Sequence, residues 1–343
     1  MNLYHPVTIG SLSLPGNLFL APVAGYSDRA FRSVCVEGGA DFGYTEMVSA
    51  EALTRGSEKT AQLMLRAPNE KAYAVQLFGG TPEVVSAAAK IVLERTNAEC
   101  IDINAGCPVP KIIKTGAGSS LTRDPDRLYT LVKAVVEAVN TYDGPRLPYP
   151  DGTVPSCSVP VTVKIRSGWD AQHLTWKEAA QAALEAGAAA ITIHARTRAQ
   201  GYEGKSDWNI LRQLVEYTAG TVPVFGSGDA FSPEDAESML KQTGCSAVMF
   251  ARGAMGHPFI FRQTRQLLET GRYDEISVKD RIQAGFHEMS LLIQDKGEGT
   301  ACREMRKRFC AYSKGLSGGA DLRRQIISAE TAEEYHRIFG SIA

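Results

Sequence analysis

Short apolar runs alternate with amphipathic segments along most of the chain. Eight such runs stand at 18–22, 42–45, 73–77, 100–104, 161–165, 190–194, 222–226 and 247–251. Helical periodicity fills several of the intervals, at 81–95, 124–139, 175–185, 206–217 and 232–242. Strands that alternate with helices are typical of βα units around a parallel sheet. Eight units in roughly 240 residues predict an α/β fold, the (β/α)8 TIM barrel.

The strand pattern stops after 252–258, and the rest of the chain is predicted to be helical. These helices are expected at 259–268, 278–295, 302–314 and 329–340. We therefore predict a barrel domain at 1–258 and a small C-terminal helical domain at 259–343. Five prolines and two glycines within 141–160 predict an extended loop before the fifth strand. We interpret it as a surface insertion without a catalytic role.

Composition narrows the class of protein. The 343 residues are 44% hydrophobic and 22% charged, as in globular proteins, and no apolar run reaches the length of a membrane span. No signal-peptide pattern is present, so we expect a cytoplasmic protein without a membrane partner. Seven scattered cysteines, with no C-x-x-C pair and no nearby histidine at ligand spacing, argue against a disulfide framework and a metal site. We also expect a monomer.

The formal net charge of −1 argues against a general nucleic-acid coat protein, but one basic stretch stands out. Residues 302–324 contain seven basic residues and two acidic ones, a local charge of +5. Together with Phe309 and Tyr312, this stretch suits contact with a phosphate backbone and some stacking on bases. A solvated helix face explains the same pattern equally well.

Polar residues with possible chemistry recur where the predicted strands end. In parallel barrels these carboxyl ends meet at one mouth, so their side chains face a ligand rather than the core. They are Gln76, Asn104, Cys107, Lys164, Arg166, His194, Arg196, the run 226–229, and Arg252 with Gly253. Each has a structural alternative: Cys107 as an inert buried thiol, Lys164 as a loop lysine and His194 as a hydrogen-bonded core histidine.

Two glycine-rich segments predict different functions. The run 226–228, with Arg252 and Gly253, supplies backbone N–H groups and a guanidinium after strands seven and eight, where TIM barrels bind phosphate. A slot with phosphate at one side and Lys164 in the middle fits FMN, because a cation stabilises the negative charge of a reduced flavin. Residue chemistry alone does not separate FMN from other phosphate-bearing ligands. The run 116–118 follows no strand, which excludes a Rossmann fingerprint.

Taken together, these residues closely resemble the tRNA-dihydrouridine synthase family. The matching segments are 21–32, 76–79, 102–108 with Lys111 and Lys114, 116–121, 163–166, 193–197, 228–229 with 252–253, 305–307 and 312–315. They keep the family's order and span nearly the whole chain, so the match is highly specific.

The resemblance implies an enzyme that reduces selected uridines of tRNA to 5,6-dihydrouridine, with FMN re-reduced by NADPH. Hydride would pass to C6 of uracil while Cys107, as general acid, protonates C5. It implies FMN contacts at Pro22, Val23, Ala24, Gln76, Lys164, His194, Ser227, Gly228, Asp229, Ala251 and Arg252. Substrate contacts are implied at Asn104, Arg166, Arg196, Arg306 and Lys307, which makes the basic stretch a tRNA surface.

The chain departs from the family at three positions. The family commonly has Met at 23, Asn at 227 and Gly at 251, where this chain has Val, Ser and Ala. These positions act mainly through backbone or flavin contact, so the geometry is affected more than the activity. Two other functions compete: an FMN barrel that reduces a free small molecule, and a catalytically silent RNA-binding barrel. The basic tail argues against the first, and intact Cys107, Lys164 and His194 argue against the second.

Overall fold

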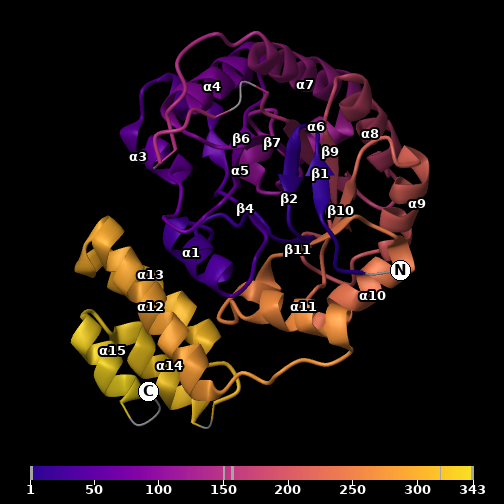
Figure 1. Ribbon diagram of the computed structural model, residues 1–343. Coiled ribbons are helices and arrows are strands. Elements are labelled where there is room, and N and C mark those ends of the chain that lie inside the picture. The colour runs from indigo at the N-terminus through magenta and orange to yellow at the C-terminus, as the bar shows by residue number, and fades with distance from the viewer. Residues whose placement is uncertain (1–2, 150, 156–157, 317, 341–343) are drawn as a thin grey trace.

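Eight parallel strands close into a barrel in the computed structural model, which describes residues 3–149, 151–155, 158–316 and 318–340 (Figure 1). In order around the barrel they are β3 (Leu18–Leu20), β4 (Phe42–Tyr44), β6 (Tyr73–Phe78), β7 (Cys100–Ala105), β8 (Val161–Gly168), β9 (Ala190–Thr197), β10 (Val224–Ser227) and β11 (Ala247–Phe250). Pairing of β4 with β6 and of β11 with β3 closes the sheet. Every predicted strand is present, so the TIM-barrel prediction is confirmed.

Helices surround the strands and bury their apolar faces against them. They are α1 (Arg29–Glu37), α2 (Ala50–Thr54), α3 (Glu58–Ala61), α4 (Pro82–Arg95), α5 (Pro110–Ile113), α6 (Ser119–Arg123), α7 (Pro125–Asn140), α8 (Trp176–Glu185), α9 (Trp208–Thr218), α10 (Pro233–Thr243) and α11 (Ile260–Thr270). The short strand β5 (Val48–Ser49) pairs with β6 beyond the end of β4. No helix in the described ranges is long and apolar enough to cross a membrane.

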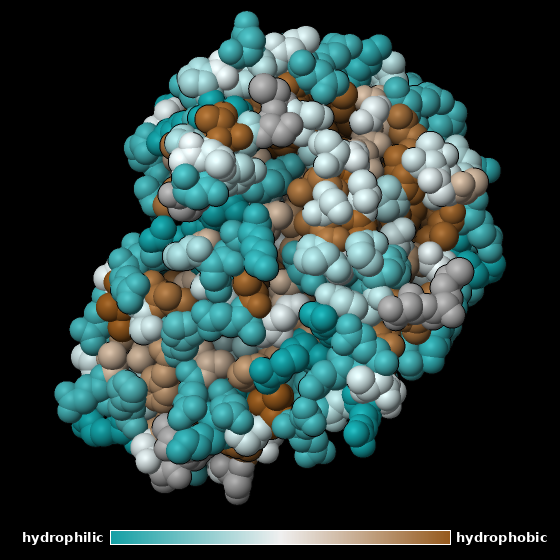
Figure 2. Space-filling view, in the orientation of Figure 1, coloured by the Kyte–Doolittle hydropathy of each residue, from teal (hydrophilic) through white to brown (hydrophobic). Residues whose placement is uncertain are grey.

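The amino end of the barrel is filled by aromatic side chains and covered by a hairpin. Phe19 makes edge-to-face contacts with Phe42 and Phe225, with ring centroids 5.6 and 5.1 Å apart. Strands β1 (Val7–Ile9) and β2 (Leu12–Leu14) pack on this layer. Figure 2, in the same orientation as Figure 1, shows mostly hydrophilic residues on this face with apolar residues between them. This end is therefore closed, and the opposite end is left for a ligand.

The proline-rich loop at 141–160 lies at the closed amino end where the structure describes it. Arg146 donates to the carbonyl of Ala98, just before β7, at 2.9 Å. Ser11, between β1 and β2, donates to the carbonyl of Ser158 at 2.9 Å. Residues 150 and 156–157 lie outside the described part of the chain. The contacts place the described part of the loop away from the carboxyl ends of the strands, in keeping with the prediction of no catalytic role.

The C-terminal helices build a second core. They are α12 (Val278–Lys296), α13 (Glu298–Tyr312), α14 (Gly319–Ser328) and α15 (Ala332–Phe339), which we call the helical region. Figure 1 shows it beside α1. Helix α14 was not among the predicted helices, and Ile326 is its only fully buried residue. Phe309 and Tyr312 are wholly buried in this core, so their expected role in stacking on bases is wrong.

Helix α11 packs with the barrel, although it falls within the segment predicted as the helical domain. Ile260 and Phe261 belong to the barrel core, and α11 lies against α10 and β3. The carbonyl of Gly38, after α1, accepts from the N–H of Arg262 at 2.9 Å. The division of the chain at 258 and 259 stays a prediction, while these contacts group α11 with the barrel helices.

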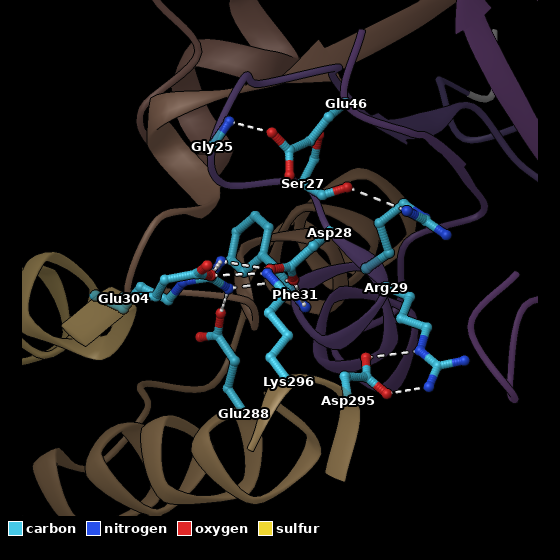
Figure 3. Close-up of polar contacts among 12 residues, drawn as sticks. Gly25, Ser27, Asp28, Arg29, Phe31, Glu46, Glu288, Asp295, Lys296 and Glu304 are labelled. Atoms are coloured by element: carbon cyan, nitrogen blue, oxygen red, sulfur yellow. Dashed lines mark hydrogen bonds and ion pairs between the residues drawn. The ribbon is translucent and has the colours of Figure 1, made fainter. Parts of the chain in front are cut away.

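A buried charge network joins the helical region to the barrel (Figure 3). Arg308 of α13 is fully buried and bridges Glu288 of α12 to Asp28, which caps the N-terminus of α1. Its Nη2 lies 2.7 Å from Asp28 Oδ2. Lys296 donates to the same Asp28 oxygen at 2.9 Å. The sequence analysis placed Arg308 on the basic tRNA surface. This is wrong, because the Arg308 guanidinium is buried and paired with Asp28 and Glu288 between the barrel and the helical region.

The network sets the charge states of its members. Burial alone would raise the pKa of Asp28, but Arg308 and Lys296 outweigh it and lower that pKa to about 2. Burial raises the pKa of Glu288, with Arg308 opposing the shift. The guanidinium also lies 5.0 Å from the centroid of the Tyr26 ring. Removing one member therefore leaves an opposite charge buried without its partner.

We expect Arg308→Met to destabilise the protein by about 3–5 kcal/mol, because Glu288 and Asp28 lose their shared cation. Urea unfolding at neutral pH measures the loss. The matched control is Arg303→Met on the same helix, where an exposed side chain donates a hydrogen bond to Thr300 and the change should stay within about 0.5 kcal/mol. Equal midpoints for the two variants would contradict a structural role for the network.

Candidate active site

A cavity of about 410 Å³ opens at the carboxyl ends of the barrel strands. Its wall contains every residue that the sequence analysis predicts to bind FMN: Pro22, Val23, Ala24, Gln76, Lys164, His194, Ser227, Gly228, Asp229, Ala251 and Arg252. Asn104, Cys107 and Arg166 line it as well. Residues far apart in sequence thus meet because parallel strands bring their carboxyl ends to one edge.

A chain of hydrogen bonds crosses the floor of the cavity from β6 to the loop after β7. Gln76 donates to Asp102 at 2.6 Å and accepts from Asn104 at 2.8 Å. The side-chain oxygen of Asn104 accepts from the backbone N–H of Gly106 at 3.2 Å and of Cys107 at 2.9 Å. The Asn104 oxygen thereby fixes the turn that presents Cys107.

Cys107 sits on that turn at the cavity wall, partly buried. Its backbone carbonyl accepts from the N–H of Ser119 at 3.0 Å. Gly118 approaches so closely, at φ +61°, that a Cβ there would lie 2.7 Å from the Cys107 carbonyl oxygen. Burial raises the pKa of the thiol, with the Val109 N–H and Arg166 opposing the shift. The thiol is therefore protonated at neutral pH and suited to donate a proton.

Lys164, on β8, brings an ammonium group to the cavity. Burial and the nearby charge of Arg166 lower its pKa to about 8, while Asp102 opposes the shift. No residue in the described ranges forms a hydrogen bond or ion pair with its Nζ. Burial raises the pKa of Asp102 to about 6 against hydrogen bonds from Gln76 and Thr162. Lys164 is thus a partly desolvated cation that an electron-rich ligand would stabilise.

The two arginines predicted to bind substrate have different environments. Arg166 lines the cavity and donates to the carbonyl of Gly106 at 2.9 Å, which supports the Cys107 turn from below. Arg196 is not part of this wall. It is 2% exposed, and its Nη2 donates to both Asp229 carboxylate oxygens, at 2.8 and 2.9 Å. The Arg196 guanidinium therefore braces the cavity rather than facing into it.

His194 is neutral in this environment. Burial, followed by the charges of Lys164 and Arg166, lowers its pKa well below the ordinary value. Its Nε2 lies 3.2 Å from Nη1 of Arg196, which can only donate. The imidazole proton is accordingly assigned to Nδ1, which leaves His194 a hydrogen-bond donor rather than a cation.

The loops after β10 and β11 form an anion cradle. Gly228 adopts φ +107°, and a Cβ there would lie 2.7 Å from His194 Cδ2 and from Ser206 Oγ. Asp229 follows at φ +61°, held by Arg196. The backbone N–H groups of Gly228, Asp229 and Gly253 donate to no other described residue. With Arg252 at the rim, they offer free donors where barrels of this kind bind phosphate.

Several residues of the wall were missed by sequence reasoning. They are apolar or aromatic: Met47, Tyr202, Phe231, Met249 and Met255. These residues carry no charged or catalytic group, so the sequence pattern does not distinguish them from ordinary core residues. They add a flat apolar surface that suits an aromatic ring system.

Arg306 and Lys307 lie outside the cavity, on α13. Arg306 donates to the carbonyl of Ala329 at 3.0 Å, inside the helical region. Lys307 is exposed and donates to the carbonyl of Gly25. Gly25 follows Val23 and Ala24 of the cavity wall, so Lys307 stands at the rim where the helical region meets the mouth.

Comparison with known proteins shows the family of this chain. A family model described as "Dihydrouridine synthase (Dus)" matches residues 19–339. The chain belongs to the dihydrouridine synthase family. A relative named probable tRNA-dihydrouridine synthase, from Treponema pallidum (strain Nichols), is 53% identical over 335 residues, covering 97% of this chain and 95% of the relative. A tRNA-dihydrouridine synthase B from Shewanella oneidensis is 35% identical, covering 89% of this chain and 88% of the relative.

Two solved structures with the same fold have lower sequence identity to this chain than these relatives. DHODH from Eimeria tenella, in complex with ferulenol, has a TM-score of 0.55 at 16% identity, covering 76% of this chain and 82% of that one. Histamine dehydrogenase from Rhizobium sp. 4-9 has a TM-score of 0.53 at 13% identity, covering 84% of this chain and 51% of that one. At these identities they establish the barrel fold alone.

We expect Lys164→Met to stabilise the ligand-free protein at neutral pH. The folded state holds this ammonium with a pKa of about 8 instead of 10.5, so charged Lys164 opposes folding below pH 8 and the effect fades as the pH rises toward 10.5. The gain is up to about 3 kcal/mol at pH 7, measured by thermal or urea unfolding across this pH range. Lys90→Met, at an exposed site on α4, is the control. A gain that did not depend on pH would contradict the electrostatic cause.

Proposed function

We propose that this protein is a flavin-dependent tRNA-dihydrouridine synthase that reduces uridine in tRNA to 5,6-dihydrouridine. The observation that carries the proposal is the meeting of three features in one cavity. These are the protonated Cys107 thiol, the unpaired Lys164 ammonium and the free N–H groups after β10 and β11. The family membership gives the same reaction.

We propose FMN as the flavin, since the donors of the wall fit it in kind and in place. The free N–H groups of Gly228, Asp229 and Gly253, with Arg252, suit a phosphate group. Lys164 and Gln76, nearer the middle of the mouth, suit the polar edge of the flavin ring. Small residues at Pro22, Val23 and Ala24 leave room for a flat ring. We propose NADPH as the reductant.

Cys107 is proposed as the general acid. A bound reduced flavin supplies hydride to C6 of uracil, and the negative charge that develops at C5 and the adjacent carbonyl needs a proton. Burial keeps the thiol protonated, and the Asn104 oxygen holds its turn through two backbone N–H groups. Arg166 supports the same turn through Gly106. We place the Asn104 Nδ2 group, which also lies 3.8 Å from Met47 Sδ, and Nη2 of Arg166 toward the uracil.

A macromolecular substrate is favoured over a free small molecule by the helical region beside the mouth. Lys307 contacts the loop that forms one wall of the cavity, so a polyanion held by the helical region would reach the opening. The target base would have to leave its stack to enter. We propose that the enzyme works as a monomer in the cytoplasm, where tRNA is found.

The proposed activity is tested by mass spectrometry of nucleosides from unmodified tRNA incubated with the flavin-bound protein and NADPH. A gain of two mass units at uridine is the expected result, and nuclease mapping then gives its position. A yellow protein that oxidises NADPH without changing tRNA would favour the small-molecule reductase instead. A protein that binds no flavin would favour the silent barrel.

Cys107→Ala should keep its flavin and its reduction by NADPH but lose turnover on tRNA by about 10²–10⁴-fold, the usual contribution of a positioned acid. Stopped-flow absorbance measures flavin reduction by NADPH and reoxidation by tRNA separately. Cys310→Ala, at a half-buried thiol of the helical region, is the matched control. Normal reoxidation of the Cys107→Ala flavin by tRNA would remove the thiol from the mechanism.

Lys307→Gln should weaken tRNA binding by roughly tenfold and reduce the slope of log affinity against log salt by about one, because one phosphate contact is lost. Flavin reduction by NADPH without tRNA should not change. Filter binding over a salt series measures both quantities, with Lys90→Gln as the control on a distant face. An unaltered salt slope would place the tRNA elsewhere.

A further inference from the structure

A second cavity, of about 830 Å³, adjoins the first and has no part in the proposed chemistry. It lies between the loops that follow β9 and β10, and Tyr202, Asp229, Phe231 and Arg252 line both cavities. It therefore continues outward from the phosphate end of the proposed flavin site. In Figure 1, α9 and α10, which follow these loops, stand at the right of the barrel, away from the helical region.

The acidic residues of this second cavity are already engaged. Asp229 accepts from Arg196 and from the backbone N–H of Ser206 at 2.7 Å. Asp207 caps α9 by accepting from the N–H of Asn209 at 3.0 Å. Asp235 accepts from the N–H of Phe231 at 2.9 Å at the start of α10. Asp229 is thereby paired with Arg196, while Asp207 and Asp235 keep their negative charge at the N-termini of α9 and α10.

Among the cations of the cavity, Lys205 is the least engaged. Lys205 is exposed and forms no hydrogen bond or ion pair with the described residues. Arg252 forms a longer ion pair with Asp229, at 3.6 Å. Ser206 is 9% exposed, and its buried Oγ has no hydrogen-bond partner although it belongs to the wall. The unpaired Lys205 ammonium and the unused Ser206 hydroxyl together suit an anionic ligand with hydrogen-bonding oxygens.

Aromatic rings stand beside these groups. Tyr202 is 60% exposed and Phe231 is 48% exposed. The Arg252 guanidinium lies 4.9 Å from the centroid of each ring. Large exposed aromatic surfaces at the rim of a cavity mark a binding site, and their faces suit a nucleobase.

We propose that this second cavity binds the adenosine end of NADPH, with Lys205 and Ser206 taking the 2′-phosphate. The assignment rests on the proposed function, since it supplies the place from which NADPH reaches the flavin. A base on the aromatic rim and a phosphate on Lys205 make the site selective for NADPH over NADH, which lacks the 2′-phosphate. tRNA is disfavoured as the occupant because the helical region meets the barrel at the loop after β3, on another side of the mouth.

The test uses adenosine 2′,5′-bisphosphate as the probe, titrated into the flavin-bound protein by calorimetry. We expect binding to the wild type and a loss of at least about tenfold in Lys205→Gln, because a charge-assisted contact to the 2′-phosphate is removed. Lys205→Arg should retain most of the affinity, and Lys90→Gln should match the wild type. Adenosine 5′-monophosphate should bind wild type and Lys205→Gln equally.

Flavin reduction gives a second readout. In Lys205→Gln the concentration of NADPH for half-maximal reduction should rise by a similar factor, while the limiting rate and the values for NADH stay unchanged. No binding of the probe to the wild type, or equal binding to Lys205→Gln, overturns the proposal. Weaker tRNA binding with unchanged probe binding also overturns it, in favour of an RNA phosphate site. Single turnover of tRNA by the dithionite-reduced wild type tests the proposed function without NADPH. Failure of the proposed function can therefore be distinguished from failure of the proposed NADPH site.

Discussion

The parallel closure of eight strands is the constraint on which the rest of this structure depends. Parallel strands place every carboxyl end on one side of the barrel, and the amino side is filled by Phe19, Phe42 and Phe225 beneath the β1–β2 hairpin. Polar side chains at the strand ends therefore lie close together in one partly desolvated cavity. Each of them either forms hydrogen bonds with its neighbours or is left to bind a ligand. The residues from Asp102 to the Cys107 turn form hydrogen bonds with one another, whereas Lys164 is left to bind a ligand.

This crowding accounts for the charge states at the site. Burial moves four titratable groups there toward their neutral forms: the pKa values of Cys107 and Asp102 rise, and those of Lys164 and His194 fall. A neutral thiol and a neutral imidazole are donors. An electron-rich ligand that stabilises the charged Lys164 would also stabilise the folded state. The buried Lys164 charge thus lowers the stability of the fold, and this cost falls at a group that can contact a ligand.

One short segment links the cavity to the helical region. Within residues 22–28, the first three line the cavity, Gly25 accepts from Lys307, and Asp28 pairs with Arg308 and Lys296. Glu46, from the loop after β4, accepts from the Gly25 N–H, as Figure 3 shows. A movement of the helical region would therefore be felt at the cavity wall through these contacts. The buried Arg308 limits such movement, because separating its partners would leave charges unpaired.

The sequence by itself determined the barrel, the eight strands and the strand-end residues that line the cavity. Apolar runs of strand length and turn residues at their ends are local signals, and a parallel barrel has one mouth at which those ends can meet. The family's motifs fixed the chemistry to be looked for. Helix α14 was missed although its apolar residues Leu322 and Ile326 lie one helical turn apart.

Only the tertiary structure decided which charges are available. Arg308 and Lys307 are neighbours in a basic run, yet one is sealed between Asp28 and Glu288 and the other is exposed at the rim of the mouth. Arg166 and Arg196 end neighbouring strands, yet one lines the cavity and the other braces Asp229 beside it. The second cavity, too, exists only where loops from different strands meet. Partners of a charge come from distant parts of the chain, so a local pattern cannot show whether that charge is already paired.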